Sequence, residues 1–329
     1  MTRFLLVGAG RIGKIHAENI VRSGRGSLVY VTDSNPAAAA ELAATWDAGV
    51  AALDNPPMDD VDAVLIASST DTHADWIERA ASAGKAVFCE KPLDLDIRRA
   101  EKCLDHVRRL GTPLYMGFNR RYDPSFARLK RESHSGAVGK IETVHIISRD
   151  PSPPPVEYVA RSGGLFRDMM IHDLDMGRWL LGEEPVEVFA RGSALVSKEI
   201  GAAGDVDTAM VILRTASGTM CQIANSRRCA FGYDQRIEVF GSEGSASAGN
   251  HTSTSVTIAG KGGYSTEPAL PFFLERYAAA YRLELDDFLN ALRGKAVELA
   301  TGEDGRKALK LADAAQESMT SGQPVKLAR

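Results

Sequence analysis

Three glycines near the start of the chain have a spacing that suits phosphate binding. Gly8, Gly10 and Gly13 follow a short apolar run, and a helical pattern of apolar residues comes directly after them. At such a strand–turn–helix junction, the first glycine permits a tight turn, the second lets the backbone approach a pyrophosphate, and the third lets the helix pack against the strand. The helix N-terminus then presents unpaired N–H groups to the phosphates. An ordinary glycine-rich turn is the alternative, but the strand before it and the helix after it favour a dinucleotide site.

A carboxylate ends the next apolar run of the sequence. Residues 28–31 are followed by Thr32 and Asp33, and no arginine or lysine occurs at positions 34–36. A carboxylate at this place binds the ribose 2′-hydroxyl of NAD and repels the 2′-phosphate of NADP. The pattern therefore predicts a nicotinamide site that prefers NAD.

Lys91 lies in Glu90-Lys91-Pro92, directly after an apolar run that ends at Cys89. The carboxyl ends of strands in an open α/β sheet are where ligands bind. A lysine at such an end can hold a substrate hydroxyl and stabilise the charge that develops as its proton leaves. Taken alone, this lysine would be better interpreted as a surface residue in an ion pair.

Asp168 and His172 are four residues apart in a predicted helix that runs from Asp168 to Leu181. That spacing places both side chains on one helical face, together with Asp175. A carboxylate one turn before an imidazole can orient the ring and stabilise the imidazolium, as the base for an alcohol oxidation requires. We expect Asp168 in the first helical turn, where the helix dipole favours a carboxylate. A surface Asp–His pair is the alternative, and the dinucleotide site and Lys91 favour the catalytic interpretation.

The pattern of elements predicts two domains. Apolar strands alternate with helices up to about residue 118, which indicates a parallel sheet with helices on both faces. Residues 119–329 contain a proline-rich loop at 150–155, several strands of antiparallel character and helices. We expect an α+β domain with a large, mainly antiparallel open sheet, whose bare face must be covered. The last helices are candidates to pack back on the first domain.

Composition excludes several classes of protein. The net charge of −4 gives no basic surface for nucleic acid or for an anionic membrane. The four cysteines show no metal-binding spacing, and His172 has no second His or Cys at ligand spacing, so no metal site is predicted. Neither a signal peptide nor a membrane span is recognised, and we expect a soluble, cytoplasmic protein with reduced, buried thiols.

The motifs together resemble the Gfo/Idh/MocA oxidoreductase family, and within it the inositol 2-dehydrogenases. The likeness runs the length of the chain and is carried by Gly-Ala-Gly-Arg-Ile-Gly (8–13), Thr-Asp-Thr-His (70–73), Cys-Glu-Lys-Pro (89–92), Gly-Phe-Asn-Arg-Arg-Tyr-Asp-Pro (117–124), Ser-Arg-Asp-Pro (148–151), Ser-Gly-Gly (162–164), Phe-Arg-Asp-Met (166–169), Ile-His-Asp-Leu-Asp (171–175) and Gly-Tyr-Asp-Gln-Arg (232–236). The resemblance implies an N-terminal NAD-binding Rossmann domain over 1–118. It also implies a substrate-binding and oligomerisation domain over 119–329, and a homotetramer packed through the open sheet face.

The resemblance also assigns roles to individual residues. The catalytic triad it implies is Lys91, which holds the reacting oxygen, Asp168, which orients the base, and His172, which takes the hydroxyl proton. The polyol pocket would be lined by Lys91, Asn119, Asp150, Tyr158, Asp168, His172 and Tyr233. The cofactor-binding residues would be Gly8, Gly10, Arg11, Ile12, Gly13, Asp33, Ser69, Thr70, His73, Glu90 and Lys91.

Two residues depart from the family pattern. Ser69 stands where a proline is common, and Met170 stands where many relatives have threonine. The first change alters the rigidity of a loop beside the nicotinamide, and the second removes a hydroxyl near the substrate.

The function we infer from the sequence is oxidation of a ring hydroxyl of myo-inositol to the ketone, with transfer of hydride to NAD. Three alternatives remain open. They are the same reaction on scyllo-inositol, D-chiro-inositol or an aldose; an NAD-dependent glycosidase, which retains its cofactor; and a non-catalytic NAD-binding regulator.

Overall fold

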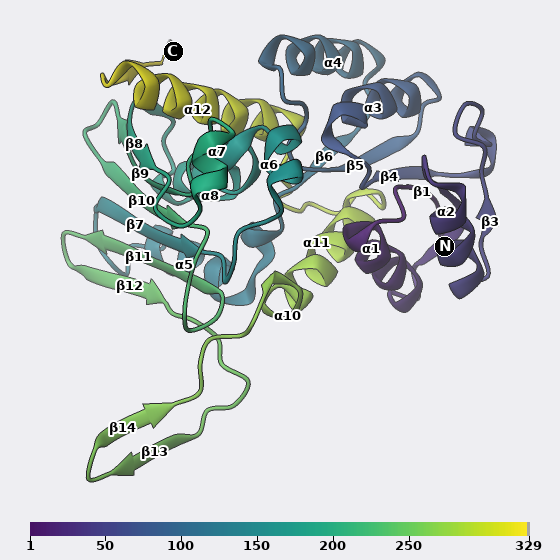
Figure 1. Cartoon of the computed structure of the whole chain (residues 1–329). Coiled ribbons are helices and arrows are strands. Elements are labelled where there is room, and N and C mark those ends of the chain that lie inside the picture. The colour runs from purple at the N-terminus through teal and green to yellow at the C-terminus, as the bar shows by residue number, and fades with distance from the viewer. Residues whose placement is uncertain (328–329) are drawn as a thin grey trace. The chain divides into compact units, whose positions relative to one another are not determined.

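The computed structural model describes residues 1–327, which form two compact units. The first unit comprises Met1–Tyr122 together with Ala280–Leu309 (Figure 1). The second comprises Asp123–Ala279 and the chain from Lys310 onward.

A parallel sheet of six strands, in the order β3-β2-β1-β4-β5-β6, organises the first unit. Its strands are β1 (Thr2–Val7), β2 (Gly26–Thr32), β3 (Gly49–Val50), β4 (Ala63–Ile66), β5 (Ala86–Glu90) and β6 (Leu114–Gly117). The order reverses between β1 and β4, and ligands bind beside such a reversal, outside the carboxyl ends of the strands.

Helices cover both faces of this sheet (Figure 1). Alternate strand residues such as Phe4, Leu6 and Phe88 pack into one core with Ile20 and Phe288 from two of the helices. The helices of the unit are α1 (Arg11–Arg22), α2 (Pro36–Thr45), α3 (His73–Ser82), α4 (Ile97–Leu110), most of α11 (Ala278–Ala291) and the start of α12 (Gly302–Ser321), with short 3-10 turns η1 (Met58–Asp60), η2 (Thr70–Thr72) and η3 (Asn119–Tyr122).

A sheet of seven strands, in the order β12-β11-β7-β10-β9-β8-β15, organises the second unit. Its strands are β7 (Ile141–Arg149), β8 (Pro185–Ser193), β9 (Thr208–Thr215), β10 (Met220–Ser226), β11 (Asp234–Gly241), β12 (Gly244–Ala248) and β15 (Val325–Lys326). All neighbouring pairs are antiparallel except β7 and β10, which run parallel. These two sheets confirm the predicted fold class.

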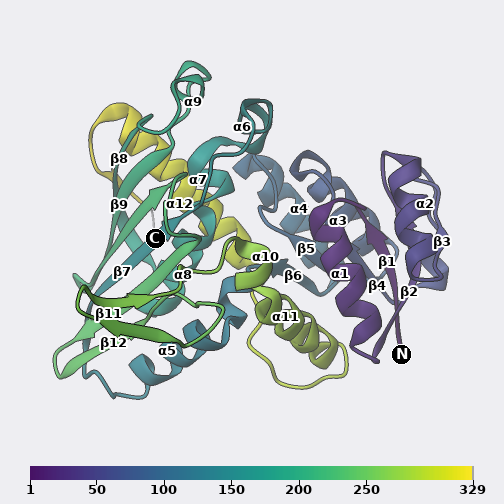
Figure 2. The same cartoon turned by 60° about the horizontal axis from the view of Figure 1, so that its bottom comes forward.

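One face of the second sheet is covered by helices, and α5 lies along β11 and β12 (Figure 2). The opposite face carries large apolar side chains that are about half exposed, namely Met210, Ile212, Met220 and Phe240. The remaining helices of the unit are α5 (Pro124–His134), α6 (Val156–Ser162), α7 (Gly164–Asp168), α8 (Ile171–Leu181), α9 (Lys198–Ala202) and α10 (Phe273–Arg276).

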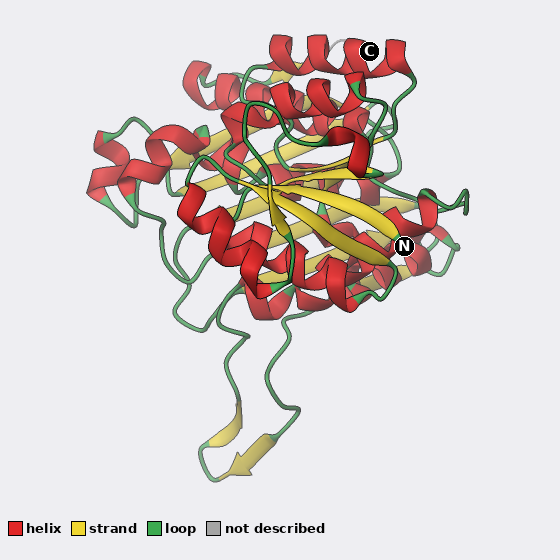
Figure 3. Cartoon of the chain, turned by 90° about the vertical axis from the view of Figure 1, so that its right-hand side faces the viewer, coloured by secondary structure: helices red, strands yellow, loops and turns green. Residues whose placement is uncertain are grey.

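A hairpin of β13 (Thr257–Gly260) and β14 (Gly263–Thr266) projects from the second unit (Figures 1 and 3). The sequence reasoning did not predict it, nor β12, α6, α9 or β15. Residues 273–291 form two helices, because Tyr277 separates α10 from α11. None of the described helices combines the length and the apolarity that crossing a membrane requires.

Candidate functional site

The glycine turn has the geometry of a phosphate cradle. Gly8 adopts a φ of +103°, and a Cβ there would lie 2.4 Å from the carbonyl oxygen of Ala67. A Cβ on Gly13 would lie 2.0 Å from the carbonyl oxygen of Gly8. The fold itself therefore requires these two glycines. A Cβ on Gly10, by contrast, would meet no protein atom within 4 Å, so this side of the turn is open to a ligand at the N-terminus of α1.

Asp33 lies beside that turn and is held there by backbone groups. Its Oδ2 accepts a hydrogen bond from the N–H of Ala9 at 2.7 Å, and its Oδ1 accepts one from the N–H of Asn35 at 2.7 Å. A carboxylate accepts about four hydrogen bonds, so both oxygens can still bind ribose hydroxyls. These residues fit an adenine dinucleotide without a 2′-phosphate.

His73 connects the loops that follow β4 and β5. Its Nδ1 lies 2.7 Å from the carbonyl oxygen of Pro92, and its Nε2 lies 3.0 Å from that of Ser68. The ring is buried, and burial lowers the pKa of His73 by more than its contacts with these two carbonyls raise it. Lys91 precedes Pro92 through a cis peptide bond and is half-buried. His73, which we predict to be a cofactor-binding residue, thus also fixes the backbone next to Lys91.

Glu90, the last residue of β5, bonds a histidine that the sequence reasoning missed. His16 Nε2 lies 2.7 Å from Glu90 Oε1, and both side chains are buried. His16 comes from α1, the helix that begins at the glycine turn, so this contact ties that helix to the strand end that carries Lys91. Nothing in the spacing of a lone histidine could have revealed it.

The remaining predicted residues of the first unit lie at the same edge of the sheet. Arg11 and Ile12 begin α1, Ser69 is exposed before η2, and Thr70 begins η2. Asn119 begins η3 just after β6 and is buried. Within residues 1–327, the buried Oδ1 of Asn119 accepts no hydrogen bond.

The predicted helix start at Asp168 is wrong. Asp168 is the last residue of α7, and α8 begins only at Ile171. The N–H groups of Met169 and Met170 both bond the carbonyl oxygen of Leu165, at 3.1 and 2.9 Å, so the chain makes a wider turn there. The regular four-residue spacing of a continuous helix therefore does not join Asp168 to His172. Asp168 lies at the C-terminus of α7 and not in the first turn of α8.

His172 instead lies in the first turn of α8, which β10 anchors. The Nδ2 of Asn225 donates to Asp173 Oδ2 at 2.9 Å and to the carbonyl oxygen of Ser148 at 3.2 Å. Asn225 and Asp173 are both buried, and Asp173 directly follows His172. This contact fixes the start of α8 against the carboxyl end of β10.

Other predicted residues of this unit lie next to the ends of three strands, β7, β10 and β11. Asp150 follows β7, and its N–H donates to the carbonyl oxygen of Ser226, the last residue of β10, at 2.9 Å. Tyr233 directly precedes β11, whose first residue, Asp234, pairs with Arg149 at the end of β7. Asp150 and Tyr233 therefore lie at one edge of the second sheet.

Asp168 is tied to this edge by two side chains. The hydroxyl of Tyr158, on α6, donates to Asp168 Oδ1 at 2.9 Å. Arg227, which follows β10 directly, lies with its Nη2 3.3 Å from Asp168 Oδ2. The sequence reasoning identified Tyr158 and missed Arg227, because a single arginine after a strand carries no spacing signal.

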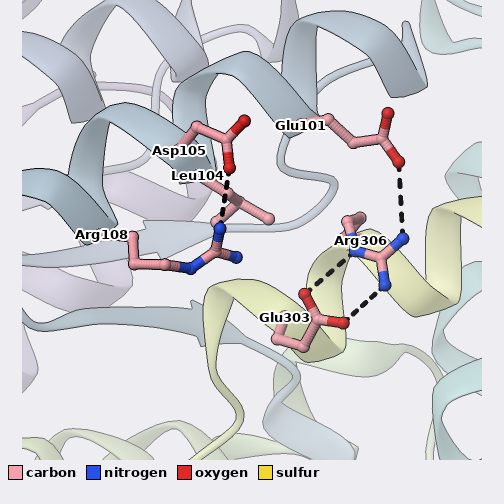
Figure 4. Close-up of a pocket in the computed structure, with 6 residues that line it drawn as sticks. All are labelled: Glu101, Leu104, Asp105, Arg108, Glu303 and Arg306. Carbon is pink, nitrogen blue, oxygen red and sulfur yellow. Dashed lines mark hydrogen bonds and ion pairs between the residues drawn. The ribbon is translucent and has the colours of Figure 1, made fainter.

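Two surface hollows, one in each unit, contain none of the predicted residues. One is lined by Glu101, Leu104, Asp105, Arg108, Glu303 and Arg306, where the arginines pair with the neighbouring carboxylates (Figure 4). In the part of the chain that the structure describes, no group of His, Cys, Asp and Glu side chains could hold a metal ion. All four cysteines are free and buried, and burial raises the pKa of Cys103 to about 12.

The chain was compared with family models and with known proteins. The model described as "Oxidoreductase family, NAD-binding Rossmann fold" matches residues 2–118, and "Oxidoreductase family, C-terminal alpha/beta domain" matches residues 134–327. The chain is 49% identical to the inositol 2-dehydrogenase of Rhizobium meliloti, over 99% of both chains.

Solved structures share the whole fold. A myo-inositol dehydrogenase from Corynebacterium glutamicum matches with a TM-score of 0.94 and 41% identity, over 100% of this chain and 99% of the other. A scyllo-inositol dehydrogenase from Lactobacillus casei, with bound NAD(H) and scyllo-inositol, matches with a TM-score of 0.90 and 31% identity, over 99% of each chain.

The dinucleotide turn on a parallel sheet, followed by an α/β domain with a mostly antiparallel sheet, defines an oxidoreductase with NAD as its cofactor. The chain belongs to the Gfo/Idh/MocA oxidoreductase family. This confirms the resemblance that its motifs indicate.

Proposed function

We propose that this protein oxidises a ring hydroxyl of myo-inositol to the ketone, 2-keto-myo-inositol. The observation that carries the proposal is the 49% identity with an inositol 2-dehydrogenase over 99% of both chains. The family membership supplies the redox chemistry, and the polar side chains at the strand ends of the second unit supply candidate ligands for a polyol.

In the proposed mechanism the polyol loses two hydrogens, one as a hydride to the cofactor and one as a proton to the protein. NAD, when bound, supplies the acceptor for the hydride from the ring carbon. His172 takes the proton of the hydroxyl as general base, and Asp168 orients the imidazole and stabilises its charged form. Lys91 holds the reacting oxygen and stabilises the negative charge that develops on it. No step requires a metal ion.

We assign the remaining predicted residues to binding. Residues 1–118 would bind NAD through the glycine turn, Asp33 and the loops after β4 and β5. Residues 119–329 would bind the polyol, with Asp150 accepting hydrogen bonds from its hydroxyls, the Tyr233 hydroxyl as a further partner, and Asn119 adding an acceptor. Tyr158 already donates to Asp168, and we propose that it acts at the rim of the polyol site, because it is 46% exposed.

A panel of substrates tests this proposal. The purified protein is incubated with NAD and myo-inositol, scyllo-inositol, D-chiro-inositol or glucose, and the absorbance of NADH is followed. We expect the highest kcat/KM with myo-inositol. Fastest turnover of scyllo-inositol would move the substrate assignment to that epimer, a possibility that the Lactobacillus casei relative supports. Turnover of a glycoside without net NADH formation would indicate the glycosidase instead.

We also propose that the protein is a homotetramer. The uncovered face of the second sheet carries Met210, Ile212, Met220 and Phe240, all at least 44% exposed. Met220 of β10 and Phe240 of β11 lie on either side of the same residue of β7, and Met210 and Ile212 lie on β9, the strand next to β10. Contiguous apolar patches on a sheet face are typical of protein–protein interfaces.

A further inference from the structure

Arg227 is a buried arginine whose backbone and guanidinium group both have partners in the fold. It directly follows β10, and its side chain is among the largest that are fully buried, with 1% of the residue exposed. Its backbone N–H donates to the carbonyl oxygen of Asp207 at 2.8 Å. Its Nη2 reaches Asp168 Oδ2 at 3.3 Å. A guanidinium in such a place stays charged, so its carboxylate partner is what makes its burial tolerable.

The two oxygens of the Asp168 carboxylate have different donors among the contacts described here. Tyr158 serves Oδ1 and Arg227 serves Oδ2. The two donors differ in environment, since Tyr158 is 46% exposed and Arg227 is buried. Because a buried side chain loses its rotameric freedom, Arg227 is the more rigid of the two supports.

The position of Asp168 explains why such a support is needed. A carboxylate at the start of a helix finds N–H donors in the first turn, but Asp168 closes α7. The groups left over at a helix C-terminus are carbonyl oxygens, which repel a carboxylate. Arg227 brings a donor to Asp168 from the end of β10.

We propose that Arg227 is a positioning residue for the reaction, which acts through Asp168. It fixes the Asp168 carboxylate in orientation through the contact of its Nη2 with Oδ2, so that Asp168 can in turn orient the base His172. This inference rests on the proposed function, because it assumes that Asp168 supports His172 in catalysis.

The test compares Arg227→Met and Arg227→Lys with a matched control. Arg178 is also a buried arginine of the second unit, 6% exposed, and its side chain pairs with Asp175 and Glu184. Arg178→Met therefore removes a buried ion pair that we place outside the catalytic machinery. Each variant is assayed for kcat, for KM with the polyol, for the pH profile of kcat, and for NADH affinity.

We expect Arg227→Met to lose about a hundredfold in kcat, the typical cost of a misplaced catalytic group. NADH affinity should stay close to that of the wild type, and the acid limb of the pH profile should move. Arg227→Lys keeps the charge and should recover only part of the rate, because an ammonium lacks the planar fork of a guanidinium. Arg178→Met should keep the wild-type pH profile of kcat, even if the loss of this ion pair makes the folded protein less stable.

A double-mutant cycle separates this inference from the proposed function. In the Asp168→Asn background, Arg227→Met should cost little further activity, because its effect passes through Asp168. The same cycle, measured by urea unfolding without cofactor, should show coupling between the two residues even if no cyclitol is a substrate. Independent effects in the unfolding cycle would overturn the inference, and so would Arg227 variants with the pH profile of Arg178→Met. Inactivity of the wild-type protein towards every polyol would overturn only the proposed function.

Discussion

The Nδ1 atom of His73 lies 2.7 Å from the carbonyl oxygen of Pro92, the residue that directly follows Lys91. Its other ring nitrogen lies 3.0 Å from the carbonyl oxygen of Ser68. A single buried side chain thus joins the loops that end β4 and β5, and both loops contain residues that we assign to the cofactor.

Acid should weaken the fold through His73. Burial lowers the pKa of His73 below its ordinary value of 6.5. The unfolded chain therefore takes up a proton first as the pH falls, and this contribution to stability is complete above pH 6.5 and declines below it. The free energy of unfolding of the wild type should fall relative to that of His73→Asn, with a slope approaching about 1.4 kcal/mol per pH unit. Urea titrations between roughly pH 7.5 and 5 measure this difference, and a difference independent of pH would remove His73 as the cause.

Cofactor choice should depend on Asp33. Its carboxylate lies beside the glycine turn and would repel a 2′-phosphate, so the wild type should have a much higher kcat/KM with NAD than with NADP. Asp33→Ser should narrow that ratio by raising activity with NADP and lowering it with NAD. Glu41→Ser is the control, because Glu41 is an exposed carboxylate of α2 that pairs with Lys14. Equal efficiency of the wild-type enzyme with both cofactors would contradict the role of Asp33.

Lys91 should affect turnover rather than folding. Removal of one preorganised donor to a developing oxyanion typically costs about a hundredfold to a thousandfold in rate, or about 3 to 4 kcal/mol. Loss of an exposed ion pair would cost about 0 to 1 kcal/mol of stability and little rate. Lys91→Met should therefore melt near the wild-type temperature and bind NADH, yet turn over myo-inositol far more slowly. Lys85→Met, just before β5, provides the control. Near-normal kcat in Lys91→Met would exclude the lysine from the mechanism.

The uncovered face of the second sheet should hold the oligomer together. Met210 is 55% exposed and Phe240 is 45% exposed, and a lysine at either place would bury a charge in the interface. The double variant Met210→Lys, Phe240→Lys should have a smaller mass than the wild type by light scattering after gel filtration. Leu110→Lys, a change of the same kind on a residue of the first unit that is 49% exposed, should leave the mass unchanged. A tetrameric double variant, or a monomeric wild type, would argue against this interface.

Sequence patterns predicted the parts of the fold that depend on local periodicity. The glycine turn, the strands before it and after it, and the end of α8 at Gly182 all follow from short-range signals. Asp33 could be placed for the same reason, because a dinucleotide turn and its carboxylate belong to one local supersecondary unit.

The features that the sequence reasoning missed depend on contacts between distant segments. The break between Asp168 and Ile171 leaves no trace in apolar spacing, since Met169 and Met170 are both compatible with a helix. Likewise, the parallel pairing of β7 with β10 brings Arg227 close to Asp150. Arg227 also contacts Asp168, although 59 residues separate the two. Only a folded chain shows that His16 and Glu90, which are 74 residues apart, are partners.

Transfer of deuterium tests the central claim most directly. The wild-type protein is incubated with NAD and with myo-inositol that carries deuterium on the carbon bearing the C2 hydroxyl, and the reduced cofactor is analysed by mass spectrometry and NMR. We predict that the deuterium appears in the nicotinamide ring of NADH, in amounts equal to the ketone formed. Reduced cofactor without deuterium, deuterium released to water, or no reduction of NAD by any cyclitol would contradict the oxidation of inositol by hydride transfer.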